Sequence, residues 1–145
     1  MTRKTQILIV LYTSIALLAL VFSWYHAVAY LGDGFAQANM AFWQDALLNA
    51  NPAGKFLTVD ILYLALACNL WMYVEGRRIG VKYITGYVLA GAVIAISFAF
   101  PLFLAMREIK LSETTALPQA SLKYHDILVL LLLAAVTLSA GVIVM

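Results

Sequence analysis

Residues 56–74 read FLTVDILYLALACNLWMYV, a continuous apolar stretch interrupted by one acidic residue, Asp60. A helix needs about 20 apolar residues to cross the hydrocarbon core of a bilayer. The stretch lacks the alternation of polar and apolar residues that is typical of a strand in a membrane barrel. Residues 56–74 are therefore predicted to form a transmembrane helix.

Three more apolar segments of similar length lie on either side of this one, over residues 7–31, 83–106 and 127–145. Loops over residues 32–55 and 107–126 separate them. The predicted fold is all-α, a single membrane domain over residues 1–145 that forms a bundle of four transmembrane helices. The first segment also resembles a secretory signal, because Arg3 and Lys4 precede it and small residues near Ala29 could form a cleavage site. Its length and its aromatic residues favour a retained span.

The composition leads to the same class of protein. Apolar residues make up 65% of the 145 positions and charged residues 11%, and the mean hydropathy is +0.95. The lipid bilayer is therefore the expected surrounding. A net charge of +2 is too small to indicate nucleic acid as a partner. The single cysteine, Cys68, excludes a paired-cysteine redox site and an internal disulfide, and the sequence requires no metal or cofactor.

A short helix is predicted inside the loop over residues 32–55. Met40, Trp43 and Leu47 recur at helical spacing there, which is typical of an amphipathic helix lying in the membrane interface. Asn51 is predicted to be the N-cap of the next helix, and Pro52 is predicted to be its first residue.

The distribution of lysine and arginine predicts the orientation. A cytoplasmic N-terminus leaves five of these residues inside and four outside, a difference of one charge. Both termini are then expected in the cytoplasm, in the inner membrane of a bacterium. The inside set is Arg3, Lys4, Arg77, Arg78 and Lys82, and the outside set is Lys55, Arg107, Lys110 and Lys123.

Asp60 is the best candidate for a functional residue, because an ionisable group inside a membrane span is costly. Its carboxylate either fixes helix packing through hydrogen bonds or acts in a cavity as a proton donor or acceptor, and the sequence leaves both open. In either case it is predicted to point into the bundle near His26 or Tyr63. Trp71, on the same helical stripe, completes the predicted ligand pocket.

The third segment carries a packing pattern and a helix breaker. Gly91, Ala95 and Ala99 recur every four residues, which lets two helices approach closely. Pro101 cannot donate a backbone hydrogen bond to the carbonyl of Ser97, so a kink is predicted there.

Charged and titratable residues mark the ends of the segments. Glu75 and Arg78 have the three-residue spacing of a helical ion pair at the membrane boundary. His26 and His125 fall on the same predicted side of the membrane, so a haem or metal site between them is an alternative interpretation. No metal-binding spacing such as HxxxH supports it, and no metal site is predicted.

Several short motifs occur along the chain: NANP at 49–52, LTVD at 57–60, EGRRIG at 75–80, AISFAFPLFL at 95–104 and RE at 107–108. Together they resemble a bacterial family, domain of unknown function 2834. Its members are small membrane proteins without an assigned activity, so the resemblance implies a topology and leaves the function open. A weaker likeness is to membrane proteins related to plant neoxanthin synthesis, which implies a polyene or isoprenoid ligand with Asp60 or Glu75 as the proton-transfer group.

Three classes of function follow. The favoured class is a non-catalytic membrane protein that binds a lipophilic small molecule or serves as an accessory subunit of a membrane protein assembly. The second is an intramembrane isomerase or related enzyme acting on an isoprenoid or polyene through Asp60. The third is a small transporter, which is disfavoured because the spans hold few ionisable groups.

Overall fold

A computed structural model describes residues 1–113 and 124–144, and the described residues form helices and no strand. The chain divides into two compact units, Met1–Thr114 and Thr115–Met145. The second unit contains one described helix, α6 (Tyr124–Val144), and the side chain of His125 at its start lies outside the described part. The all-α prediction is confirmed.

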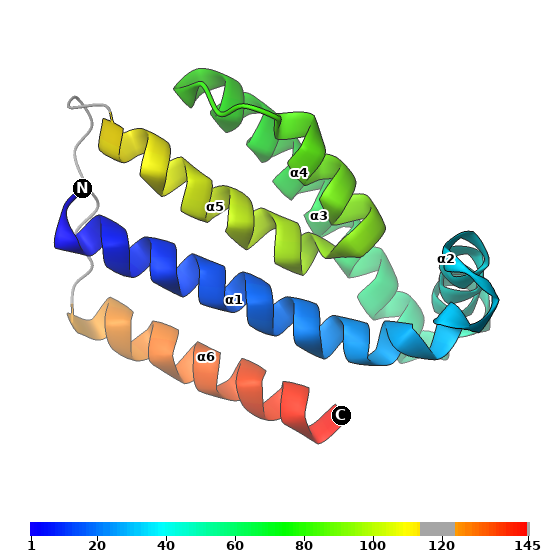
Figure 1. Cartoon of the computed structure of the whole chain (residues 1–145). Coiled ribbons are helices and arrows are strands. Elements are labelled where there is room, and N and C mark those ends of the chain that lie inside the picture. The colour runs from blue at the N-terminus through cyan, green and yellow to red at the C-terminus, as the bar shows by residue number, and fades with distance from the viewer. Residues whose placement is uncertain (114–123, 145) are drawn as a thin grey trace. The chain divides into compact units, whose positions relative to one another are not determined.

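The first half of the larger unit forms two long helices joined by a short one (Figure 1). α1 (Arg3–Ala27) continues into a 3₁₀ turn, η1 (Val28–Asp33), and α2 (Phe35–Gln44) continues into a π-helical turn, η2 (Asp45–Asn49). The short helix expected within residues 32–55 is thus present.

α3 (Pro52–Ile79) begins as the sequence predicts. The side chain of Asn51 accepts a hydrogen bond from the backbone N–H of Gly54 at 2.8 Å, and Pro52 is the first helical residue. The helix ends at Gly80, whose φ of 70° is the left-handed conformation that glycine adopts without steric cost.

The third apolar segment folds back on itself. It consists of α4 (Ile84–Ala90), a π-helical turn, η3 (Gly91–Ala95), and α5 (Ile96–Glu113). The rings of Tyr87 and Phe103 lie 5.6 Å apart, whereas sixteen residues of straight helix would separate them by about 24 Å. η3 is therefore the tip of a helical hairpin, and we refer to residues 84–113 as the α4–α5 hairpin.

Small residues permit this reversal. A Cβ atom added to Gly91 would lie 3.6 Å from the Cβ of Ala99, so the two legs touch at this point, and Ala99 is fully buried. The small-residue pattern thus joins the two legs of one hairpin. Pro101 lies in the second turn of α5, and the reversal falls at η3, ahead of the position at which the proline was expected to kink the helix.

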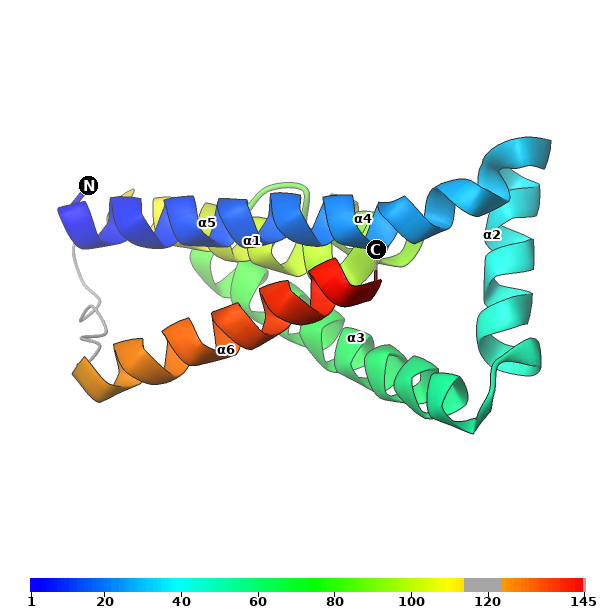
Figure 2. The same ribbon diagram turned by 90° about the horizontal axis from the view of Figure 1, so that it is seen from below.

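The larger unit has two ends (Figure 2). α1 and α5 run side by side in opposite directions, so the N-terminus and the last residues of α5 lie at one end, together with the connection between α3 and α4. α2 crosses the other end and links α1 to α3.

The buried core lies toward the first of these ends, where α3 meets the α4–α5 hairpin. Met72, Val81 and Phe103 form its centre, with Ile84 and Tyr87 among the residues packed around them. A Cβ atom added to Gly76 would lie 2.9 Å from Ile84, so α3 approaches the hairpin closely there.

Three helical stretches in the described residues are long and apolar enough to cross a membrane: Arg3–Gly32, Pro52–Ile79 and Ile84–Glu113. In α6 the corresponding apolar stretch, Leu128–Ala140, is shorter. The described residues thus contain three stretches suited to a membrane, in place of the four predicted. α5 also continues through residues 107–113, which were expected to begin a loop.

Candidate functional site

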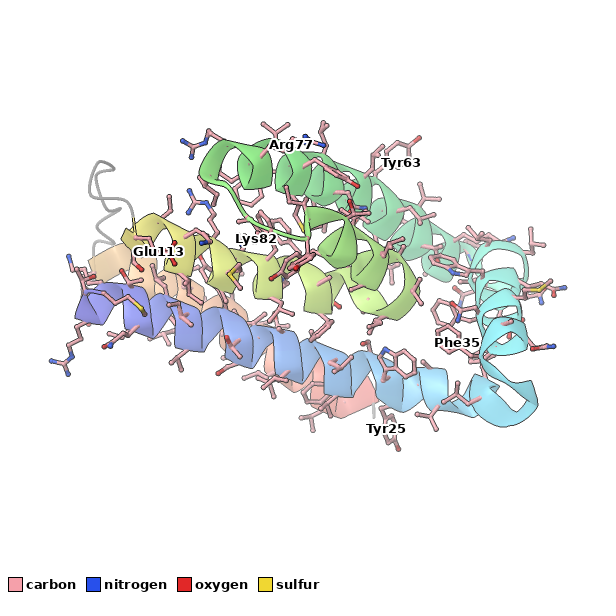
Figure 3. The ribbon with its side chains drawn as sticks, turned by 45° about the horizontal axis from the view of Figure 1, so that its top comes forward. Tyr25, Phe35, Tyr63, Arg77, Lys82 and Glu113 are labelled. Atoms are coloured by element: carbon pink, nitrogen blue, oxygen red, sulfur yellow. The ribbon has the colours of Figure 1, made fainter. Side chains whose placement is uncertain are left out.

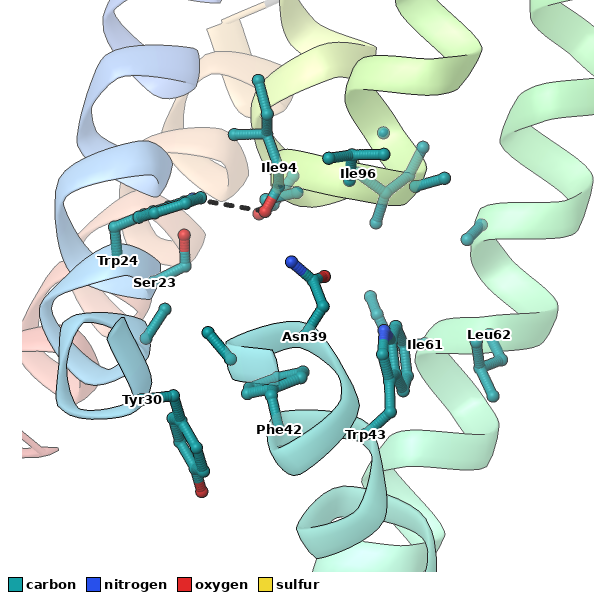
Figure 4. A pocket seen from close by; sticks show the side chains of 18 of the residues that line it. Ser23, Trp24, Tyr30, Asn39, Phe42, Trp43, Ile61, Leu62, Ile94 and Ile96 are labelled. Carbon is teal, nitrogen blue, oxygen red and sulfur yellow. Dashed lines mark hydrogen bonds between the residues drawn. The ribbon is translucent and has the colours of Figure 1, made fainter. Parts of the chain in front are cut away.

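An apolar pocket of about 650 Å³ lies in the larger unit between α1, α2, α3 and η3 (Figure 4). The tip of the α4–α5 hairpin closes one end of the pocket and α2 closes the other. Aromatic side chains from α1, η1 and α2 line one part of it, and aliphatic side chains from α3 line another. A mainly apolar cavity of this size with a few polar groups is typical of a small-molecule site.

The hairpin tip is hydrogen-bonded to α1. The indole N–H of Trp24 donates to the backbone carbonyl of Ile94 at 3.2 Å, as Figure 4 shows. A π-helical turn alters the regular ladder of backbone hydrogen bonds, and η3 contains the carbonyl that accepts this bond. Trp24 thus fixes the tip at the edge of the pocket.

Hydrogen bonds at η2 hold the end of α2 that is nearer to α3. The Tyr30 hydroxyl donates to Asp45 Oδ2 at 3.0 Å, and Asn49 donates to Asp45 Oδ1 at 2.8 Å. Both bonds lower the pKa of Asp45, and the bond from Asn49 has the larger effect. The Thr58 hydroxyl of α3 lies 2.8 Å from the carbonyl of Gly54 in its own helix and 3.2 Å from the carbonyl of Ala46. η2 thus contacts both η1 and α3.

Two carboxamides reach the pocket. Asn39 of α2 points toward the hairpin tip in Figure 4, and its Nδ2 donates to the carbonyl of Phe35 at 3.1 Å. Asn69 of α3 lines the pocket as well, and its Oδ1 is buried without a hydrogen-bond partner among the described residues. Asn69 therefore presents a buried polar atom with unused hydrogen-bonding capacity at the pocket.

A cluster of charges lies outside this pocket, at the end of the larger unit that holds the N-terminus. The Glu75 carboxylate, only 8% exposed, accepts hydrogen bonds from Arg78 at 2.6 Å and from Arg107 at 2.7 Å. Arg107 also donates to Glu108 at 3.0 Å and lies over the ring of Trp71, 5.7 Å from its centroid. The four charges balance, so the cluster joins α3 to α5 rather than offering a free charge to a ligand.

The predicted site residues are not brought together. Asp60 is exposed and makes no hydrogen bond or ion pair with any described residue. Tyr63 is 71% exposed and points away from the bundle (Figure 3), and His26 contacts the ring of Tyr25. Trp71 packs against Phe103 beside the charge cluster. None of these four predicted residues lines the pocket; on α3 the polar residue that does so is Asn69.

The expectation that Arg107 and Arg78 lie at opposite ends of the bundle is wrong, since both donate to Glu75. That expectation assumed that residues 83–106 cross the membrane once. In the structure the hairpin turns back, so α5 ends at the same end of the larger unit at which α4 begins. The Glu75 and Arg78 pair has the spacing that the sequence indicated, and Arg107 is its unpredicted third member.

No group of three or more metal-ligating side chains occurs in the described part of the chain. Polar residues at the pocket are amides and hydroxyls, which can hydrogen-bond to an uncharged ligand but supply no evident nucleophile or acid–base pair.

Comparison with known proteins gives a family and no activity. No curated protein and no solved structure matches the chain. A family model described as "Protein of unknown function DUF2834" matches residues 11–109, which is more than half of the chain and covers every element that lines the pocket. The chain belongs to the DUF2834 family of proteins of unknown function.

Proposed function

We propose that this protein binds a lipophilic small molecule in the pocket between α1, α2, α3 and η3. The observation that carries the proposal is the pocket itself, about 650 Å³ in volume and lined mainly by apolar and aromatic side chains. Its walls are hydrogen-bonded in place at the Trp24 contact with η3 and at the Thr58 contact with η2. A pre-formed apolar cavity favours ligand binding because little ordering is required when the ligand enters.

The position of the pocket suits a ligand that arrives from the bilayer. The apolar stretch of α3, residues 56–74, has Ala65 at its centre, and Asn69 lies four residues from it, which is about 6 Å along the helix axis. The roughly 30 Å hydrocarbon core is about as thick as this stretch is long. The hairpin tip beside Asn69 therefore lies near the middle of the membrane, and the pocket extends from there toward α2.

The orientation that accompanies this proposal places the end with the charge cluster in the cytoplasm, in a bacterial inner membrane. Basic residues near membrane spans are enriched on the cytoplasmic side. With the α4–α5 hairpin folded back, all but one of the described lysines and arginines lie at this end, and the exception is Lys55. The residues at this end are Arg3, Lys4, Arg77, Arg78, Lys82, Arg107 and Lys110.

Lipids that copurify with the protein test the proposal. The protein and two variants are purified in mild detergent, and the extracted lipids are identified by mass spectrometry. Ala65→Phe fills the pocket, because Ala65 lines it, whereas Ala67→Phe places the same ring on the exposed side of the same helix. We expect one lipophile at near-stoichiometric amount in the parent and in Ala67→Phe, and its loss in Ala65→Phe. Recovery of bulk phospholipid alone from all three proteins would overturn the proposal.

A further inference from the structure

The carboxamide of Asn69 identifies a chemical feature of the ligand. Its Oδ1 is buried and has no hydrogen-bond partner in the described part of the chain. Nearly all buried polar atoms in proteins have a partner, and an exception calls for a missing donor. In an apolar surrounding this need is stronger than in water, because an unpaired acceptor there loses its hydration without replacement.

Several neighbouring donors of the pocket are committed elsewhere. The indole N–H of Trp24 is bonded to the carbonyl of Ile94, and Nδ2 of Asn39 is bonded to the carbonyl of Phe35. The hydroxyl of Tyr30 donates to Asp45, and that of Ser23 donates to the carbonyl of Ala19. Two further donors, Trp43 and Ser97, line the pocket, but no donor of the described residues lies within hydrogen-bonding distance of Asn69 Oδ1. A molecule in the pocket can supply the missing donor.

The residues that line the pocket also restrict the ligand's charge. They include no aspartate, glutamate, lysine, arginine or histidine. A charged headgroup would lose its hydration there without gaining an opposite charge, which is costly in a low-dielectric site. The ligand is therefore neutral where it meets the pocket wall.

We infer that the ligand is a neutral lipid alcohol, with a hydroxyl group hydrogen-bonded to the Asn69 carboxamide. This inference rests on the proposed lipophile site and adds the chemical class of its occupant. A hydroxyl both donates and accepts, which matches an amide that offers an acceptor oxygen and a donor nitrogen.

Asn69 lies beside the hairpin tip. A Cβ atom added to Gly91 would lie 3.8 Å from Oδ1, an ordinary van der Waals distance, so the amide oxygen lies next to η3. The terminal torsion of an asparagine side chain is soft, so the amide can turn its oxygen toward the pocket. The aliphatic residues Ile61, Leu62 and Leu66 of α3 then contact the apolar body of the lipid.

A matched pair of probes tests the hydroxyl. Retinol and its methyl ether share one polyene and differ in the O–H donor. Each is titrated into the full chain in phosphatidylcholine nanodiscs, and binding is followed by quenching of the fluorescence of Trp24 and Trp43, which line the pocket. We expect retinol to bind about tenfold more tightly than the ether, the effect of one net hydrogen bond.

Two variants assign the preference to a residue. Asn69→Leu is expected to weaken retinol binding to the level of the ether and to leave ether binding unchanged. Ala67→Leu places the same side chain on the exposed side of the same helix, away from the pocket, and is expected to keep the preference. Retention of the preference in Asn69→Leu would overturn the assignment to Asn69.

Binding of the two probes to the parent protein distinguishes failure of the hydroxyl inference from failure of the proposed lipophile site. Equal binding of alcohol and ether would overturn the hydroxyl inference and leave the lipophile pocket intact. Absence of saturable binding of either probe, together with recovery of bulk phospholipid alone after purification, would overturn both.

Discussion

Arg107 donates a hydrogen bond to the carboxylate of Glu75 at 2.7 Å, although 32 residues separate them in the sequence. That contact requires the end of α5 to lie beside the end of α3. A single crossing by residues 84–113 would instead carry Arg107 to the opposite face of the membrane. The ion pair is thus evidence for the α4–α5 hairpin that is independent of the Gly91 and Ala99 contact.

The hairpin predicts which residues face the same side of the membrane. Cysteines introduced at Lys82 and Glu113, with Cys68 replaced by serine, should react with an impermeant maleimide from one side. A cysteine at Ala53, at the start of α3, should react from the other side. Labelling of the position at Glu113 together with that at Ala53 would show that residues 84–113 cross the membrane, contrary to the structure.

Removal of the Glu75 carboxylate should destabilise the larger unit strongly. Glu75→Gln leaves Arg78 and Arg107 without their shared partner, and breaking a buried pair costs about 3 kcal/mol. Thermal unfolding in detergent measures the effect. Arg77→Gln is the control, because Arg77 is exposed and belongs to no ion pair of the described residues. A similar melting temperature for Glu75→Gln and the control would contradict a structural role for the cluster.

The two arginines of the cluster should contribute unequally. Arg107 is 26% exposed and also covers Trp71, whereas Arg78 is 52% exposed. Exposed ion pairs contribute little, about 0–1 kcal/mol, because water screens them. Arg107→Met should therefore lower the melting temperature more than Arg78→Met, and the reverse order would show that the cation over Trp71 adds nothing.

Overpacking at the hairpin should also be measurable. Ala99→Leu adds volume where Gly91 and Ala99 touch, and overpacked cores lose about 1–3 kcal/mol. The same substitution at the exposed Ala67 is the control. Equal unfolding temperatures of the two variants would mean that the legs of the hairpin are not in contact.

The hydrogen bonds of Asp45 give a pH dependence of known sign. The pKa of Asp45 is lowered in the folded protein, so its stabilising contribution is fully present above the ordinary aspartate pKa near 3.9 and is lost as pH falls through the lower folded value. The difference in melting temperature between parent and Asp45→Asn should thus be constant near neutral pH and shrink toward acid. A difference that persists unchanged in strong acid would contradict the lowered pKa.

Local features of the fold could be predicted from the sequence, because residues close in the chain produce them. Asn51 and Pro52 begin α3 as expected, and Glu75 and Arg78 meet because three residues on a helix lie on one face. The apolar segments likewise indicated helices in a bilayer. These predictions depend on local sequence and not on which helices are neighbours in the fold.

The hairpin and the pocket could not be predicted in this way, because both depend on contacts between distant residues. Residues 83–106 form one apolar run in the sequence, and contacts between distant residues, such as that of Gly91 with Ala99, show that the run turns back. Asp60 is the charged residue inside the apolar stretch of α3, which predicted a role for it, yet the uncharged Asn69 on another face lines the pocket. Hydropathy and charge do not distinguish a helix face that meets protein from one that meets lipid.

The folded-back hairpin also limits the work of membrane insertion. In the proposed orientation both of its ends lie on the cytoplasmic side with Arg78 and Arg107, so no polar segment of residues 80–113 has to be translocated. If α1 and α3 each cross the bilayer, the stretch between them, which contains α2, is the part of the larger unit that is carried across. That stretch holds two acidic residues, Asp33 and Asp45, and no basic residue, so its passage through an apolar barrier costs less than that of a segment bearing the arginine cluster.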